Sequence, residues 1–131
     1  MKLLGIDYGD KRTGLAIGDS QDKIAVDFST ITTVLSDVLV DEISATIASE
    51  GIDQVVVGLP LSLDGSETAQ TLIVKKFAEK LAEAIHVPVV FEDERLSSKE
   101  FEKLSRKERQ AKGLDALSAM TILQSYIDKM K

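Results

Sequence analysis

The sequence predicts an α/β fold in which a mixed β-sheet carries helices on both faces. Near the N-terminus, three short segments rich in β-branched residues, 2–9, 13–18 and 24–34, are separated by Gly-Asp and Asp-Lys turn signals. This pattern is typical of an antiparallel meander of three strands. After residue 35, segments with helical spacing alternate with short apolar runs. Three strands followed by this alternation give the order βββαβαβα, which predicts a mixed sheet covered on both sides.

The first predicted helix follows the third strand. Ser36 is a candidate N-cap and Gly51 is a candidate C-terminal stop. Between them, Leu39, Ile43 and Ile47 recur at the spacing of one helix face. We expect this face to be buried against the sheet.

A second pair of strand and helix comes next. Residues 55–57 form a short apolar run typical of a buried strand, and the polar loop 60–65 leads into a helix from about Ser66. Free amides at the start of that helix could hold an anion, although a routine strand-to-helix connection is the commoner explanation of such a loop. The apolar residues expected on one face of this helix are Leu72, Ile73, Phe77, Leu81 and Ile85.

The last predicted strand, 89–91, runs into an acidic stretch at 92–94. Ser97 and Glu100 form a capping box, so a helix is expected directly after that stretch. The final helix is predicted from about residue 114 to the C-terminus. Its apolar stripe is expected to consist of Ala116, Ala119, Met120, Leu123 and Ile127.

The composition excludes several classes of function. The chain has 131 residues and no cysteine, which removes thiol catalysis, thiolate metal sites and disulfides. Its length predicts a single domain over residues 1–131. The N-terminal apolar run is too short and too charged for a signal peptide, and no stretch approaches the roughly 20 apolar residues that span a bilayer. We therefore expect a cytoplasmic protein without membrane contact.

Charge is distributed unevenly along the chain. The formal net charge is -6, but the segment 99–112 contains six basic and three acidic residues, so it carries +3 and the remainder carries -9. A basic patch on an acidic body is compatible with a polyanion that docks in one place. A solvated helix face with mixed charges explains the same segment equally well.

Asp7 is the first candidate for chemistry, because it is the one carboxylate in the apolar run 2–9. Strand alternation places it on one face with Leu3 and Gly5. Burying an unpaired carboxylate is costly, so such a residue usually meets a cation or hydrogen-bond donors. The alternative is that Asp7 merely starts a turn.

Further carboxylates lie at two other element ends. Asp115 borders the buried face at the start of the last helix, although a plain first-turn Asp favoured by the helix dipole is the commoner explanation of such a residue. After the last strand, alternation sends Asp93 and Glu94 to opposite faces, so only one of them is expected to follow the inward face. With Asp7 they form an oxygen-only ligand set suited to Mg²⁺ or Mn²⁺.

Four motifs occur together, at 5–14 (GIDYGDKRTG), 57–60 (VGLP) with 64–65 (DG), 93–98 (DERLSS), and 115–119 (DALSA) with 122–124 (ILQ). In this order and spacing they closely resemble the YqgF/RuvX family of bacterial ribonuclease H-like proteins, relatives of the RuvC-type Holliday-junction resolvases. The match covers nearly the whole chain. The resemblance implies a ribonuclease H-like fold, with a five-stranded mixed sheet of order 3-2-1-4-5 flanked by helices. It also implies a metal-dependent nuclease that matures the 5′ end of pre-16S ribosomal RNA.

The resemblance also implies roles for individual residues. The family's catalytic and metal-binding carboxylates fall on Asp7, Asp93, Glu94 and Asp115, which would hold one or two Mg²⁺ or Mn²⁺ ions. Its basic residues correspond to Lys11, Arg12 and Arg95, and a basic loop with Arg106, Lys107, Arg109 and Lys112 is expected to hold backbone phosphates as well. Where junction resolvases carry a glutamate, this chain has 58–60 (GLP), so the 93–94 pair would supply that carboxylate. Ser118 stands where the family usually has alanine, and Gly18 where a serine is common.

The expected partner is nucleic acid, either pre-rRNA or branched DNA, and ribosomal particles are a further candidate. Two functions remain as alternatives to a pre-rRNA nuclease. One is a resolvase that cleaves branched DNA, and the other is an adaptor that binds nucleic acid or the ribosome without catalysis.

Overall fold

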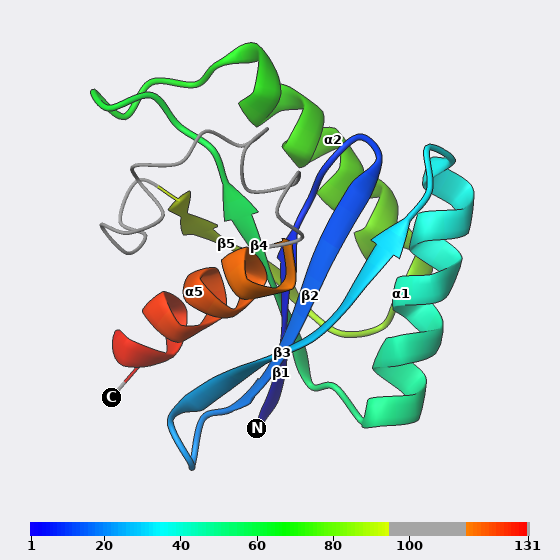
Figure 1. The fold of residues 1–131 in the computed structure, drawn as a ribbon, viewed down its shortest axis with the longest axis vertical. Helices are drawn as coiled ribbons and strands as arrows, with labels where there is room; N and C mark the ends of the chain where they lie inside the picture. The colour runs from blue at the N-terminus through cyan, green and yellow to red at the C-terminus, as the bar shows by residue number, and fades with distance from the viewer. Residues whose placement is uncertain (95–114, 131) are drawn as a thin grey trace.

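The computed structural model describes residues 1–94 and 115–130. Within them the predicted element order is confirmed (Figure 1). The strands are β1 (Lys2–Asp7), β2 (Arg12–Asp19), β3 (Ile24–Thr32), β4 (Gln54–Leu59) and β5 (Val89–Asp93), and the helices are α1 (Ser36–Glu50), α2 (Ala69–Ala84) and α5 (Asp115–Asp128). The helix expected from the capping box at 97–100 lies outside the described residues.

The described strands form one five-stranded sheet of order β3-β2-β1-β4-β5, as predicted. Strands β1, β2 and β3 pair antiparallel, whereas β1 pairs parallel with β4 and β4 parallel with β5. Because β1, β4 and β5 run in the same direction, their C-terminal ends meet at one end of the sheet. Asp7, Leu59 and Asp93 are the last residues of these three strands, so the candidate carboxylates lie at that end.

The two faces of the sheet are covered by different helices (Figure 1). On one face, Leu4 and Ile6 of β1 pack into a core that is completed by α1 and α2. On the other face, Leu3 packs into a second core that is completed by α5. The alternation expected for β1 is therefore confirmed, and it assigns Asp7, which follows Leu3 and Gly5 in alternation, to the face covered by α5.

The ends of α1 show one correct and one wrong prediction. Gly51 ends the helix in the left-handed conformation with φ 65°, and its amide donates to Ile47 O. The expected N-cap was wrong: Leu35 occupies that position without a side-chain cap. Ser36 is instead the first helical residue, and its hydroxyl accepts a hydrogen bond of 2.8 Å from Lys80 Nζ of α2. The serine thus joins two helices rather than capping one.

Helix α2 begins three residues later than expected, and its expected buried face is correct at Phe77, Leu81 and Ile85 but wrong in the first turn. Thr68 is its N-cap, and Thr68 and Thr71 form a reciprocal capping box. Leu72 and Ile73 were expected to be buried, but their side chains are 58% and 44% exposed. The positions that are buried are Thr71, Val74, Phe77, Ala78 and Leu81. The physical reason is that Thr71 also donates to Pro60 O, which fixes the rotation of the first turn.

Helix α5 lies closely on the sheet because glycines form the surface beneath it. A Cβ atom built on Gly5 would lie 2.7 Å from Leu123 Cβ, and one on Gly18 would lie 2.8 Å from Ile127 Cδ1. The buried residues of the helix are Asp115, Ser118, Ala119, Ile122, Leu123 and Ile127. The predicted stripe was thus correct at Ala119, Leu123 and Ile127, whereas Ala116 and Met120 are only half-buried.

In the part of the chain that the structure describes, no helix is both long and apolar enough to cross a lipid bilayer.

Candidate active site

Asp7 ends β1 with only 7% of its surface exposed. In the antiparallel pairing of β1 with β2, its Cα lies opposite the Cα of Gly14. Side chains of directly opposed residues point to the same face of a sheet, and Gly14 faces α5, since a Cβ built there would overlap the carbonyl oxygen of Asp115. The geometry therefore directs the Asp7 side chain towards the start of α5.

Asp115 is the first residue of α5 and is 3% exposed. Its backbone rests on Gly14, where any side chain would collide with the peptide group between Asp115 and Ala116. Asp7 thus lies beside Gly14 in the sheet, and Asp115 lies over it. Two nearly buried carboxylates, 108 positions apart in the sequence, are brought to the same face and the same end of the sheet.

Glu94 and Asp93 are separated by the sheet. A Cβ built on Gly58 would lie 2.9 Å from Glu94 Oε1 and 2.5 Å from Ile122 Cδ1, so Glu94 lies on the α5 face. Asp93 pairs with Leu59, whose side chain packs against the core under α1 and α2. Strand alternation therefore gives Asp93 the opposite face. Of the two candidates, Glu94 is the one that shares its face with Asp7 and Asp115.

The chemistry of this donor set fits a hard divalent cation, because every candidate ligand is a carboxylate oxygen. The arrangement is nevertheless incomplete as it stands. Among residues 1–94 and 115–130, no three Asp, Glu, His or Cys side chains lie close enough together to hold a metal ion. The residues available to a metal ion here are therefore the two buried carboxylates, Asp7 and Asp115, and a third carboxylate, Glu94, on the same face of the sheet.

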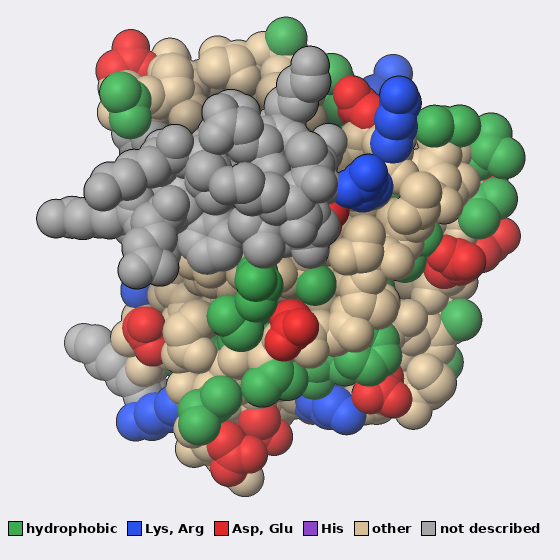
Figure 2. Space-filling model, in the orientation of Figure 1, with side chains coloured by type: hydrophobic (Ala, Val, Ile, Leu, Met, Phe, Trp, Pro, Cys, Tyr) green, Lys and Arg blue, Asp and Glu red, His purple; other side chains and the backbone are tan. Residues whose placement is uncertain are grey.

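Basic residues border this end of the sheet. Lys11 is exposed and Arg12 is half-buried, and both lie in or next to the turn between β1 and β2. In Figure 2, lysine and arginine side chains gather beside this turn. The other predicted phosphate-binding residues, Arg95, Arg106, Lys107, Arg109 and Lys112, lie outside the described residues.

The loop between β4 and α2, a candidate anion site from the sequence, is occupied by its own acidic side chain, because Asp64 accepts the hydrogen bond of the Ser66 amide. Asp64 Oδ1 accepts hydrogen bonds of 2.9 Å from the Ser66 amide and 2.7 Å from the Ser66 hydroxyl, and a further one from the Ser62 hydroxyl. These hydrogen bonds stabilise the charged form and hold the pKa of Asp64 well below its usual range; the largest effect comes from the Ser62 hydroxyl, and the next from the Ser66 hydroxyl and amide. A carboxylate that is charged at neutral pH repels anions from this loop.

Glu92 is a residue that the sequence interpretation missed. Its side chain is buried at 5% exposure, and its Oε2 accepts hydrogen bonds of 2.8 Å from Ser125 Oγ and 2.6 Å from Lys129 Nζ. Ser125 belongs to α5 and Lys129 directly follows its last residue, so Glu92 fastens the C-terminal end of the helix to β5. The sequence does contain a signal for its position: strand alternation places Glu92 on the same face of β5 as Glu94.

Gln124 makes the corresponding connection to the other edge of the sheet. Its side-chain oxygen accepts a hydrogen bond of 2.9 Å from the Ala25 amide, and its nitrogen donates one of 2.9 Å to Lys23 O. Helix α5 is therefore tied to β3 through Gln124 and to β5 through Glu92. These two ties hold the helix whose first residue is Asp115.

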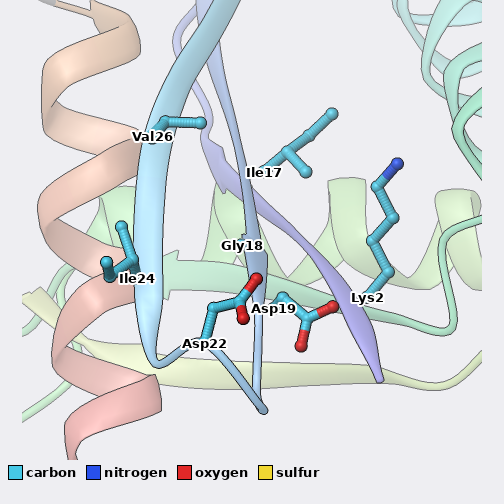
Figure 3. Close-up of a pocket in the computed structure, with 7 residues that line it drawn as sticks. All are labelled: Lys2, Ile17, Gly18, Asp19, Asp22, Ile24 and Val26. Carbon is cyan, nitrogen blue, oxygen red and sulfur yellow. The ribbon is translucent and has the colours of Figure 1, made fainter.

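A groove of about 560 Å³ lies at the opposite end of the sheet from Asp7 (Figure 3). Ile17, Ile24 and Val26 give it apolar surface, and it also includes Asp19 at the end of β2 and Asp22 of the following turn. The lining consists of Lys2, Ile17, Gly18, Asp19, Asp22, Ile24 and Val26. Because it includes none of the candidate carboxylates, this groove is separate from the site.

Solved structures with the same architecture include proteins in complex with Holliday junctions. The structure of T. thermophilus RuvC in complex with a Holliday junction substrate superimposes with a TM-score of 0.62 at 15% identity, covering 98% of this chain and 94% of that one. The fowlpox virus Holliday junction resolvase in complex with its substrate gives a TM-score of 0.57 at 10% identity, covering 98% and 97%. At these identities the likeness establishes the fold, which is the ribonuclease H-like fold predicted from the sequence.

Sequence relatives are much closer. A protein of Caldanaerobacter subterraneus named "Putative pre-16S rRNA nuclease" is 40% identical, covering 100% of this chain and 99% of its own. A protein of the same name from Rickettsia conorii is 36% identical, covering 98% of this chain and 87% of its own. The sequence profile of the RuvX family, described as Holliday junction resolvase, matches residues 1–129. The chain therefore belongs to the RuvX family.

Proposed function

We propose that this chain is a nuclease that depends on a divalent metal ion and cleaves pre-16S rRNA within the strand to mature its 5′ end. The observation that carries the proposal is the pair of buried carboxylates, Asp7 and Asp115, placed on one face around Gly14. The names of the relatives support the choice of RNA. Such a substrate would place the protein in the cytoplasm and in contact with ribosomal particles.

In this proposal, Asp7 and Asp115 hold one or two Mg²⁺ or Mn²⁺ ions, and Glu94 completes the ligand set. A bound divalent cation supplies activation of a water molecule and neutralisation of charge on the phosphate. The glycine beneath Asp115 keeps the two carboxylates at a fixed separation. The hydrogen bonds of Glu92 and Gln124 fix the position of α5 on the sheet, so that Asp115 stays close to Asp7.

Basic side chains orient the substrate. Lys11 and Arg12 stand at the end of the sheet that carries the carboxylates, where they can contact the phosphates on either side of the bond to be cleaved. We assign the same role to Arg95 and to the basic segment 106–112. Asp93, on the opposite face, has no direct role in this scheme, although the resemblance placed it among the catalytic residues.

The test is cleavage of matched substrates by the parent protein and two variants. The substrates are an RNA that carries the 5′ extension of 16S rRNA, a single-stranded DNA of the same sequence and a four-way DNA junction. Each is incubated with Mg²⁺, with Mn²⁺ or with EDTA. Asp7→Asn removes a proposed ligand, and Asp10→Asn is the matched control, because it removes the same charge from an exposed residue of the adjoining turn.

The proposal expects metal-dependent cleavage of the RNA that Asp7→Asn abolishes and Asp10→Asn retains. Cleavage of the junction alone would assign the chain to branched DNA, which is the activity in the family's description. Binding without cleavage of any substrate would favour the adaptor. Cleavage that survives in Asp7→Asn would show that the activity arises elsewhere.

A further inference from the structure

We infer that a groove on the sheet face opposite Asp7 and Asp115 binds a nucleotide of the same single-stranded substrate, with its base against Tyr8 and its phosphate at Lys76. The inference rests on the proposed function, because it extends the path of the substrate beyond the carboxylates. The groove has a volume of about 300 Å³, at the small end of the range for ligand sites. Its lining residues are Tyr8, Ser36, Ile73, Lys76, Phe77 and Lys80.

The groove contains a fixed aromatic surface. The rings of Tyr8 and Phe77 stack with centroids 4.4 Å apart and an interplanar angle of 26°. Phe77 is 4% exposed and belongs to the core, whereas Tyr8 is half-buried and lines the groove. A tyrosine held in this way is a preformed platform, on which a base of any sequence can stack.

Cationic groups stand at the edge of that platform. Lys76 is exposed, and no acidic side chain of the described residues forms an ion pair with it. Lys80 lies one turn further along α2 and is engaged by Ser36 and Asp37. Within the described residues, Lys76 is thus the lysine of this lining whose charge no carboxylate pairs, which suits a phosphate, while Lys80 and Ser36 complete the lining.

The groove adjoins the candidate active site through the backbone. Tyr8 directly follows Asp7, so consecutive residues point to opposite faces at the end of β1. Thr33, three residues before Ser36, donates a hydrogen bond of 2.9 Å to Lys11 O, which holds the basic turn against the start of α1. A single strand that crosses the end of β1 can therefore contact Asp7, the basic turn and Tyr8 in succession.

Charge distinguishes this groove from the larger one at the other end of the sheet. That groove is bordered by Asp19 and Asp22, which would repel a polyanion (Figure 3). The groove beside Tyr8 is lined by Lys76, by Lys80, which is paired with Asp37, and by no acidic residue. The complementarity therefore favours the smaller groove for a phosphodiester strand, whether RNA or DNA.

The experiment measures binding of fluorescein-labelled single-stranded 12-mers of RNA and of DNA by anisotropy, in EDTA and over a series of salt concentrations. Lys76→Gln is compared with Lys75→Gln, which removes the same charge from the neighbouring residue, paired with Glu67 and absent from the groove lining. Lys76→Gln should weaken binding about two- to fivefold at low salt. It should also reduce the log-log salt slope by about 0.7, and Lys75→Gln should do neither.

The aromatic surface is tested with Tyr8→Leu against Tyr8→Phe, which keeps the ring. Leucine should weaken binding about tenfold, and phenylalanine should bind like the parent. The lysine pair keeps the inference testable if Tyr8→Leu does not fold. If the parent protein binds and cleaves, but Lys76→Gln and Lys75→Gln bind equally well, the inference about the groove is wrong and the proposed function stands. Specific loss in Lys76→Gln without any cleavage by the parent would support the groove and overturn the nuclease.

Discussion

Gly14 and Asp115 are in direct contact, the glycine near the start of β2 and the aspartate at the first turn of α5. A methyl group on residue 14 would overlap the Asp115 carbonyl, and backbone atoms cannot move aside as a flexible side chain can. The position of Asp115, a proposed metal ligand, therefore depends on the absence of a side chain at Gly14, which is not itself a proposed ligand.

We predict that Gly14→Ala destabilises the protein by about 1 to 3 kcal/mol and reduces cleavage, because the start of α5 must shift. Urea denaturation and the cleavage assay measure the two effects. Gly51→Ala is the control: that position has open space around it, so it should lose only about 1 to 2 kcal/mol from its left-handed backbone and should keep its activity. Full activity in Gly14→Ala would contradict the proposed site.

Asp7→Asn should leave the folded state intact in EDTA, or stabilise it by up to about 1 kcal/mol. The reason is that it removes one of two like charges buried on the same face. Added Mn²⁺ should stabilise the parent by about 1.4 kcal/mol at ten times its Kd and should have little effect on the variant. Thermal or urea unfolding with and without Mn²⁺ measures both. Loss of folding in EDTA would show that Asp7 has a structural role instead.

Glu94→Gln should abolish cleavage, whereas Asp93→Asn should reduce it at most a few-fold. The two substitutions remove the same charge from neighbouring residues, but only Glu94 lies on the face of Asp7 and Asp115. Single-turnover rates at saturating Mn²⁺ separate a lost ligand from weaker substrate binding. A severe defect in Asp93→Asn with an active Glu94→Gln would reverse the assignment.

Lys129→Ala should cost about 1 to 2 kcal/mol of stability, because Glu92 stays buried while one of its two donors is lost. The estimate is modest because the Lys129 side chain is 51% exposed and solvent screens its charge. Lys75→Ala breaks an exposed ion pair with Glu67 and should cost about 0.5 kcal/mol or less. Urea denaturation compares the two variants, and equal losses would show that Glu92 does not fasten α5.

Sequence patterns predicted the strands and their faces well, because a buried strand requires an apolar run and alternation follows from the pleat. The rotation of the helices was harder to predict. On α2, Leu72 and Ile73 fit the apolar periodicity, yet the contact of Thr71 with Pro60 turns them outward. On α5, Ser118 is buried while Met120 is only half-buried, because the glycines of the sheet determine which side of the helix approaches it.

The candidate site was also predictable only in part. Asp7 and Asp115 are visible in the sequence as carboxylates at the edge of apolar patterns. The choice between Asp93 and Glu94 required the register of β4 with β5, which no local pattern encodes. Glu92 was missed because a buried ion pair depends on a partner 37 residues away, and neither residue is unusual in its own surroundings.

Gln124 has a consequence for the behaviour of the protein at high concentration. The outer border of β3 would otherwise present open amide and carbonyl groups, which are a template for adding a strand from a second molecule. At Ala25 and Lys23 those groups are already occupied by the Gln124 side chain. A strand from a second molecule could pair there only if it displaced the Gln124 side chain, and with it α5, from β3. The Gln124 side chain therefore blocks this stretch of the β3 edge while it holds α5, and we expect its loss to appear first as a lower yield of native protein.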